Sequence, residues 1–148
     1  MESKKSAAGF SLLELMIVVV IVGIITSIAY PSYQNHMTSA RRTDAQSVLM
    51  EAAQFMERFY TENNRYDQDT GGTAVALPAE LNEAPRDAGT KAYDITVQAS
   101  TASSFTLRAT PKNMQAGDGF IEITNTFAKA WDRNNSGAIT AGENSWAD

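Results

Sequence analysis

The chain of 148 residues contains no cysteine and only one histidine, His36. The lack of cysteine excludes disulfide bonds, thiol catalysis and zinc sites of the Cys/His type. No nucleophile, base and orienting residue can be picked out together, so we do not expect an enzyme. Basic residues are also few: twelve Lys and Arg against seventeen Asp and Glu give a net charge of −5. This balance argues against sequence-independent binding of nucleic acid.

The apolar residues are concentrated near the N-terminus, in residues 10–30. This run of about 21 residues is long enough to cross a hydrocarbon core of ~30 Å as a helix. Lys4 and Lys5 precede it, which predicts a cytoplasmic N-terminus and an external C-terminal part. Small residues of the kind that signal cleavage come before the run, at Ala7–Gly9, and not after it. Cleavage after Gly9 would therefore leave the apolar helix on the mature protein.

Glu14 is an ionisable residue inside this apolar run. A carboxylate in a membrane span is costly and indicates a function. If the chain is cut after Gly9, the new amine of Phe10 lies about one helical turn before Glu14, so this chain or a neighbouring one can supply a cation to neutralise it. The alternative is that Glu14 lies close enough to the membrane surface to stay hydrated.

A long motif covers the start of the apolar run and the residues after it: Gly9, Phe10, Ser11, Leu12, Leu13, Glu14, Leu15, Met16, Ile17, Val18, Val19, Gly23, Tyr30, Pro31, Tyr33 and Gln34. This motif resembles the N-terminus of type IV pilins. The resemblance implies cleavage between Gly9 and Phe10 by a prepilin peptidase, N-methylation of Phe10, and a role for Glu14 in filament assembly. In the family this carboxylate is thought to pair with the N-terminal amine of an adjacent subunit. An unpaired carboxylate in an apolar bundle costs several kcal/mol, which agrees with such pairing.

A helix kink is predicted between Gly23 and Pro31. Glycine is a weak helix former, and proline lacks a backbone donor and clashes with the preceding turn. In related pilins this stretch can lose helical structure within the filament. The alternative is that both residues are simply common in membrane helices.

Residues 31–63 are predicted to extend the helix as an amphipathic half. Apolar residues recur at spacings of three and four and should face a sheet: Ala45, Val48, Leu49, Ala52, Phe55, Met56 and Phe59. The pattern ends at Asn63 and Asn64, as is common for an asparagine-rich helix C-terminus. Arg41 and Arg42 are candidates for contact with lipid phosphates or with acidic residues of a neighbouring subunit, or are solvated surface charges. For His36 we expect a solvated position.

Residues 64–148 are predicted to form the head of an α+β pilin fold, in which a long N-terminal helix packs on a three- to four-stranded antiparallel sheet. A loop rich in Gly, Pro, Asp and Asn covers residues 66–92. Alternating segments then predict strands at residues 93–99, 105–110, 120–124 and, as a short fourth strand, 126–131. Residues 1–9 would be the leader peptide and residues 10–30 the membrane and filament-core helix.

The head also resembles PilE-type minor pilins, a group that includes ComP-like DNA-uptake receptors. The similar segments are Arg41–Gln46, Met56–Tyr60, Phe105–Pro111 and Ala116–Asp118. Those pilins usually carry a cysteine pair that closes the C-terminal region, and this chain has none. Its C-terminal loop is therefore either held differently or loose.

The C-terminal sequence contains a candidate calcium loop at residues 132–143. It matches the twelve-residue calcium-loop spacing, with candidate ligands Asp132, Asn134, Ser136, the carbonyl of Ala138, Thr140 and Glu143, the turn glycine Gly137 and the apolar Ile139. A bound Ca²⁺ would hold the loop that relatives close with a disulfide, and major pseudopilins of type II secretion, which the chain resembles more loosely, bind calcium in a C-terminal loop. The alternative is an ordinary exposed turn of the same composition. No other cofactor is expected.

The leading hypothesis is a minor pilin of a type IV pilus that serves twitching motility, adhesion or DNA uptake. Its partners would be other pilins, the prepilin peptidase and the inner-membrane assembly machinery. The protein would lie in the bacterial inner membrane before assembly and in the cell-surface pilus afterwards. One alternative is a pseudopilin of a type II secretion system. Another is a DNA-uptake receptor, which is disfavoured because the chain without Lys4, Lys5 and Glu2 keeps ten basic and sixteen acidic residues, a net charge of −6.

Overall fold

A single long helix, α1 (Leu12–Asn63), forms the first part of the computed structural model, which describes residues 10–87 and 89–147. The helix continues through Gly23 and Pro31, as the sequence predicts for one long helix. The chain divides into two compact units after Met37.

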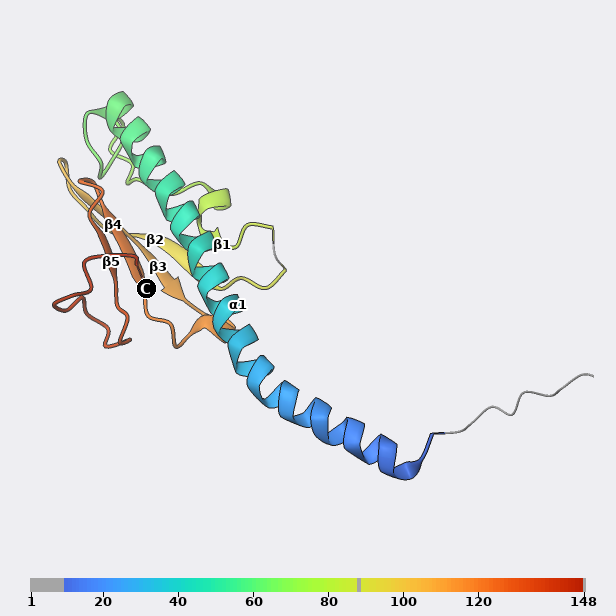
Figure 1. Ribbon diagram of the computed structural model, residues 1–148. Coiled ribbons are helices and arrows are strands. Elements are labelled where there is room, and N and C mark those ends of the chain that lie inside the picture. The colour runs from blue at the N-terminus through green and yellow to red at the C-terminus, as the bar shows by residue number, and fades with distance from the viewer. Residues whose placement is uncertain (1–9, 88, 148) are drawn as a thin grey trace, which may run out of the picture. The chain divides into compact units, whose positions relative to one another are not determined.

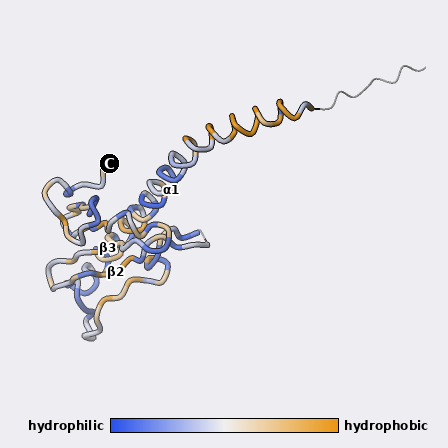
Figure 2. The backbone as a smooth tube through the Cα atoms, turned by 90° about the horizontal axis from the view of Figure 1, so that it is seen from below, coloured by the Kyte–Doolittle hydropathy of each residue, from blue (hydrophilic) through white to orange (hydrophobic). Residues whose placement is uncertain are grey.

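The first unit contains the apolar half of α1. Figure 2 shows its turns coloured as hydrophobic. The segment is long and apolar enough to cross a membrane by length and composition. Its large side chains are at least half exposed, from 50% at Ile21 to 78% at Leu12. This half of the helix therefore has no packed core of its own.

The second unit begins with the amphipathic half of α1. The predicted apolar stripe is confirmed at its centre, where these side chains are buried: Ala45, Val48, Leu49, Ala52 and Met56. Phe55 and Phe59 at its end are half-buried, and Ala53, which the stripe did not include, is buried. Asn64 ends the helix in a left-handed conformation with φ of 55°, which asparagine tolerates well. The N–H of Asn64 donates to the carbonyl of Tyr60 at 2.7 Å, which satisfies one of the last helical acceptors.

A five-stranded antiparallel sheet follows, in which strands adjacent in sequence are adjacent in space. Its strands are β1 (Glu83–Ala84), β2 (Tyr93–Ser100), β3 (Phe105–Pro111), β4 (Ile121–Thr124) and β5 (Lys129–Trp131). Two short 3₁₀ helices, η1 (Ala79–Leu81) and η2 (Asn113–Gln115), flank the sheet segments. Figure 1 shows the second half of α1 lying across one face of this sheet.

The sheet differs from the prediction in two places. The segment 66–92, predicted as a loop, contains η1 and β1, because Ala84 is fully buried and pairs with Tyr93. A strand of two residues shows no periodicity in sequence. The fourth predicted strand, 126–131, starts only at Lys129, because Phe127 adopts a φ of 58° and its N–H donates to Thr124 at 2.8 Å in a turn.

The core lies between the buried face of α1 and one face of the sheet. The sheet contributes alternate residues, which are buried because successive side chains of a strand point to opposite faces: Tyr93, Ile95, Phe105, Leu107, Ala109, Ile121 and Ile123. On the opposite face, Arg108 donates through Nε to Glu122 at 2.8 Å across the β3–β4 pair. The core residues all belong to the second unit.

Candidate functional site

The N-terminal end of α1 carries the carboxylate that the sequence singles out. The helix starts after Ser11, and the backbone N–H of Ser11 donates to Oε2 of Glu14 at 3.4 Å. This is one half of a capping box, in which the third helical residue reaches back to the residue that precedes the helix. Phe10 is 83% exposed, and Gly9 lies outside the described residues. Within this chain, Glu14 caps its own helix and remains exposed to a partner.

The predicted kink region is continuous helix in the described chain. Pro31 has no N–H to donate to the carbonyl of Ser27, one turn earlier. Within the same stretch, between Gly23 and Pro31, the Ser27 hydroxyl donates to the carbonyl of Ile24 at 2.7 Å. Bending or unwinding of this stretch in a filament stays a prediction.

A buried ion pair joins α1 to the segment before β4. Arg42 donates through Nε and Nη2 to the two carboxylate oxygens of Asp118 at 2.8 and 2.6 Å. The side chains are only 9% and 8% exposed. The guanidinium also lies 3.7 Å from the centre of the Trp131 ring. The prediction that Arg42 is available to lipid phosphates or to a neighbouring subunit is therefore wrong, because its guanidinium is committed inside the head.

Three further side chains complete this buried cluster. The hydroxyl of Tyr93 donates to Asp118 at 2.5 Å, and Nε1 of Trp131 donates to the carbonyl of Asp118 at 2.7 Å. Nε2 of Gln115 lies 2.9 Å from Asp118 and 3.0 Å from the carbonyl of Thr38 in α1. Burial raises the pKa of Tyr93 strongly, and its hydrogen bond to Asp118 raises this pKa further. We call Arg42, Asp118, Tyr93, Gln115 and Trp131 the head clamp.

The head clamp is not predicted by the sequence patterns. Arg42 is predicted there as a solvated surface charge or a contact to lipid or a neighbouring subunit, and Asp118 has no predicted role. The position of Arg42 three residues before Ala45, in line with the apolar stripe, is the signal that the sequence offers, since an arginine on a buried face needs a partner. Its partner lies 76 positions later in the chain and shares no local pattern with it.

The candidate calcium loop is closed at its start by Asp132, which is fully buried. Its Oδ1 accepts a hydrogen bond from the N–H of Ser136 at 2.8 Å, and its Oδ2 accepts one from the N–H of Gly137 at 2.8 Å. Gly137 has a φ of 85°, so it supplies the sharp turn that the loop spacing predicts. The Asp132 carboxylate is thus the centre around which the chain reverses.

Glu143 closes the other end of the loop and is 6% exposed. It accepts hydrogen bonds from the N–H and hydroxyl of Thr140, both at 2.7 Å, and from the N–H of Asn134 at 3.2 Å. The hydrogen bonds from Thr140 hold the pKa of Glu143 below its usual value. Its carbonyl accepts from the N–H of Trp131 at 2.9 Å, which joins the loop to β5.

Several oxygens of the predicted calcium ligands lie close together. The hydroxyl of Ser136 lies 3.0 Å from the carbonyl oxygen of Ala138 and 3.3 Å from Oδ1 of Asp132. Hard oxygen donors of this kind suit Ca²⁺. Within residues 10–87 and 89–147, however, no group of three or more Asp, Glu, His or Cys is positioned to hold a metal. A calcium site here would therefore have two carboxylate ligands, Asp132 and Glu143, and neutral oxygens for the rest.

Trp146 anchors the end of the C-terminal segment on the sheet. Its Nε1 donates to the carbonyls of Glu122 and Ala130 at 3.0 and 3.1 Å. The ammonium of Lys129 lies 4.7 Å from the centre of its ring. With no cysteine in the chain, these contacts and the two loop carboxylates hold the C-terminal segment, as far as the structure describes it.

An exposed apolar helix that leads into an amphipathic half packed on an antiparallel sheet defines the class of type IV pilin-like proteins. Comparisons with known families and structures agree with this class. Residues 31–122 match the family described as "Type IV minor pilin ComP, DNA uptake sequence receptor", and residues 4–30 match the prokaryotic N-terminal methylation motif. The chain belongs to the ComP family of type IV minor pilins.

Individual relatives cover parts of the chain. It is 35% identical over 74 residues to a fimbrial protein of Pseudomonas aeruginosa, covering 43% of this chain and 48% of that protein. It is 29% identical over 89 residues to the type II secretion system core protein G of Klebsiella michiganensis, covering 57% and 63%. The chain thus spans about half the length of the fimbrial relative it matches.

A solved structure shares the fold. The non-core minor pilin PilV of Neisseria meningitidis matches with a TM-score of 0.52 at 19% identity, covering 76% of this chain and 98% of that chain. This likeness confirms the predicted helix-on-sheet architecture.

Proposed function

We propose that this chain is a minor subunit of a type IV pilus. The observation that carries the proposal is the exposed apolar half of α1, whose large side chains are at least half exposed from Leu12 to Tyr33. A continuous apolar surface of this size needs a membrane or other apolar helices to cover it. A helix that leaves the membrane and packs among the N-terminal helices of other pilins in a filament satisfies this need in both states.

Processing and assembly follow from the N-terminal motif. The prepilin peptidase cleaves between Gly9 and Phe10, and the new amine of Phe10 is methylated. Glu14 then pairs with the N-terminal amine of an adjacent subunit. Its exposure at the first turn of α1 supports this role, because the capping contact to Ser11 is long and leaves room for a stronger, charged partner.

The topology has the N-terminus inside and the head outside the bacterial inner membrane before assembly, and the head on the cell-surface pilus afterwards. Lys4 and Lys5 ahead of the apolar run support this orientation. The partners are other pilins, the prepilin peptidase and the inner-membrane assembly machinery. Twitching motility, adhesion and DNA uptake are the functions such a pilus would serve.

The decisive experiment replaces Glu14 with Val in a strain that lacks the chromosomal copy. The variant should accumulate in the membrane like the unchanged protein but be absent from sheared filaments. Leu13→Val is the matched control, because it changes the neighbouring position without removing a charge, and it should be incorporated normally. Normal incorporation of Glu14→Val would contradict the assembly role of Glu14, and absence of the unchanged chain from filaments would contradict the pilin function.

A DNA-uptake receptor is a second candidate, favoured by the description of the matching family. The charges of the described head weigh against it, because most of the arginines are paired with acids. Lys112 likewise contacts both Glu83 and Asp94. A salt-dependent mobility shift of duplex DNA by the detergent-solubilised chain would favour this candidate, and no shift at low salt would remove it.

A pseudopilin of a type II secretion system is the other candidate, favoured by the similarity to core protein G. The two functions predict different losses when the gene is deleted. A minor pilin deletion should abolish or alter surface pili, whereas a pseudopilin deletion should stop secretion of periplasmic enzymes and leave pili unchanged.

We also propose that the loop from Asp132 to Glu143 binds Ca²⁺. The ion would hold the loop in addition to the carboxylate contacts described above and would do so weakly, because only two ligands are carboxylates. Calorimetric titration with CaCl₂ should give a dissociation constant of roughly 10⁻⁴ to 10⁻³ M, in the range of extracellular calcium modules. Asn134→Ala should weaken it, and Ser103→Ala in a turn outside the loop is the control. No heat and no melting shift at millimolar calcium would refute the site.

A further inference from the structure

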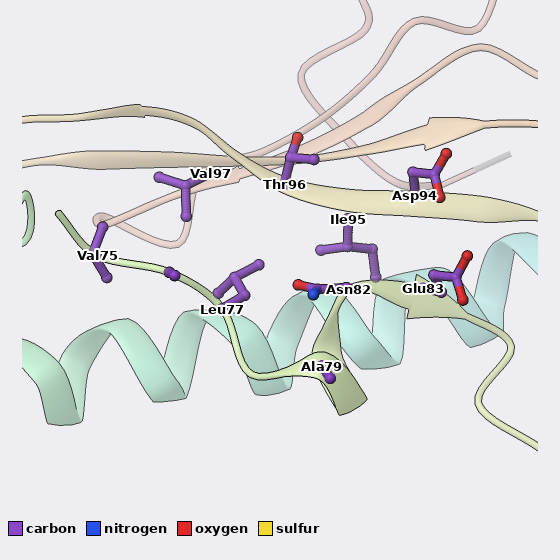
Figure 3. A pocket seen from close by; sticks show the side chains of 10 residues that line it. Val75, Leu77, Ala79, Asn82, Glu83, Asp94, Ile95, Thr96 and Val97 are labelled. Atoms are coloured by element: carbon purple, nitrogen blue, oxygen red, sulfur yellow. The ribbon is translucent and has the colours of Figure 1, made fainter.

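An open groove runs along the outer edge of the sheet, with a volume of about 730 Å³. Figure 3 shows its two walls: the segment Val75–Leu77 on one side and the strand β2 from Asp94 to Val97 on the other. One end of the groove is lined by Ala79, Asn82 and Glu83, near η1 and β1. This volume lies within the range of specific ligand sites.

One wall of the groove is an incompletely paired strand edge. The N–H of Ile95 donates to the carbonyl of Asn82 at 2.7 Å, and this is the last contact between β2 and the β1 segment. In an antiparallel strand the backbone N–H and C=O groups of every second residue point to the same side. The N–H and the carbonyl of Val97 therefore face the groove, and no backbone partner for them is found among the described residues.

Three apolar side chains around this edge, Val75, Leu77 and Val97, are only half-buried. They contact the core from its margin. The segment of Val75 and Leu77 runs beside β2 in Figure 3 without joining the sheet. An extended backbone inserted between them would gain strand hydrogen bonds from β2 and apolar contacts from both walls.

The end of the groove is acidic. The ammonium of Lys112 contacts Glu83 and Asp94, both at 2.5 Å, so that two carboxylates share one positive charge. Glu83 and Asp94 remain 43% and 51% exposed. One excess negative charge therefore lies where β1 begins, and it would favour a basic side chain on an incoming segment.

We propose that this groove binds an extended peptide segment of another protein, which adds to the sheet beside β2. The segment lies antiparallel to β2, as β1 does, with apolar side chains at alternate positions and a basic residue near its C-terminal end, which lies toward Glu83 and Asp94. Its backbone pairs with the N–H and the carbonyl of Val97, beyond the position opposite Ile95 that Asn82 already occupies. None of the residues that line the groove belongs to residues 10–30.

The test uses the full chain in detergent micelles and a fluorescent peptide, acetyl-Thr-Val-Thr-Val-Lys-amide. Two variants of the peptide serve as probes: one has Glu in place of Lys, and one has N-methyl groups on the backbone nitrogens that would face β2. Binding is followed by anisotropy, and exchange of the Val97 amide by NMR. The unmodified peptide should bind saturably, at least tenfold more tightly than either variant peptide, and should slow exchange of the Val97 amide at least tenfold.

Val97→Pro removes the N–H that faces the groove without removing a β2–β3 hydrogen bond, and it should reduce peptide binding at least tenfold. Val97→Thr keeps the N–H and a branched side chain, and it should bind as the unchanged chain does. The peptide variants keep the test valid if Val97→Pro fails to fold. Absence of binding at millimolar peptide, equal binding of the N-methylated peptide, or slow exchange of Val97 without peptide would overturn the proposal. The last result would mean that the chain itself or a second copy covers the edge.

Discussion

Loss of the negative charge at Asp118 should destabilise the head strongly. In Asp118→Asn the side chain keeps its shape, but the guanidinium of Arg42, at 2.6 and 2.8 Å, loses its counter-charge. Both side chains are less than 10% exposed, so water cannot replace the lost partner. Breaking a buried ion pair in this way costs about 3–5 kcal/mol.

The assay is urea unfolding of the full chain in micelles, followed by tryptophan fluorescence. Trp131 is a direct reporter, because it donates to Asp118 and lies under Arg42. With a slope of about 1.5–2 kcal/mol per molar urea for a head of this size, the midpoint should fall by roughly 2 M. The double variant Arg42→Met/Asp118→Leu should lose less than the single variant, because it leaves no unpaired charge.

Asp67→Asn is the matched control. Arg65 and Asp67 form a two-pronged pair of the same geometry, at 2.6 and 2.8 Å, but it lies on the surface. Exposed pairs contribute little, so the urea midpoint should not move measurably. Equal midpoints for Asp118→Asn and the unchanged chain would refute the view that the head clamp stabilises the fold.

Two further predictions concern the C-terminal loop. Gly119 has a φ of 76°, and a methyl group there would collide with the carbonyl oxygen of Asp132, so Gly119→Ala should cost about 2 kcal/mol or more. Gly117→Ala, where the added methyl group meets nothing within 4 Å, should melt close to the unchanged chain, and equal melting of both variants would contradict the close approach. Because the pKa of Glu143 is lowered, its contribution to stability is present above the ordinary value of 4.5 and is lost as pH falls through the lower folded value. The Thr140 amide should report this transition by NMR and should not titrate in that range in Glu143→Gln; an unchanged Thr140 signal in the unchanged chain from pH 6 to 2 would contradict it.

The helix was largely predictable from the sequence because its signals are local. An uninterrupted apolar run predicts the first half, spacings of three and four predict the buried stripe of the second, and Asn63 and Asn64 mark the end. The strands β2, β3 and β4 were predicted within one residue at each end, since each has an alternating pattern bounded by turns.

Features that depend on tertiary contacts were not predictable. β1 exists because Ala84 fills a buried position beside Tyr93. A strand of only two residues is too short to show an alternating pattern in the sequence. The start of β5 depends on the left-handed conformation of Phe127, a residue type that rarely adopts it. The pairing of Arg42 with Asp118 requires the fold itself, because the two residues are adjacent only after α1 lies on the sheet.

The candidate calcium loop shows how far spacing alone can lead. The pattern predicted the turn at Gly137, where φ is positive. In the structure, oxygen atoms of Asp132, Ser136 and Ala138 lie close together, as the pattern predicts for ligands of one ion. The same pattern could not show that Asp132 and Glu143 are already satisfied by backbone N–H groups of the loop. Calcium binding would require those hydrogen bonds to coexist with the ion or to be exchanged for it.

The most direct test of the pilin function is mass spectrometry of the chain recovered from sheared surface filaments. The recovered chain should begin at Phe10 with one added methyl group, in the same fraction as other pilin subunits. In a strain without the prepilin peptidase the chain should retain residues 1–9, and it should then be confined to the membrane. A chain that retains residues 1–9 in the filaments, or that is absent from them in a peptidase-positive strain, would contradict the account.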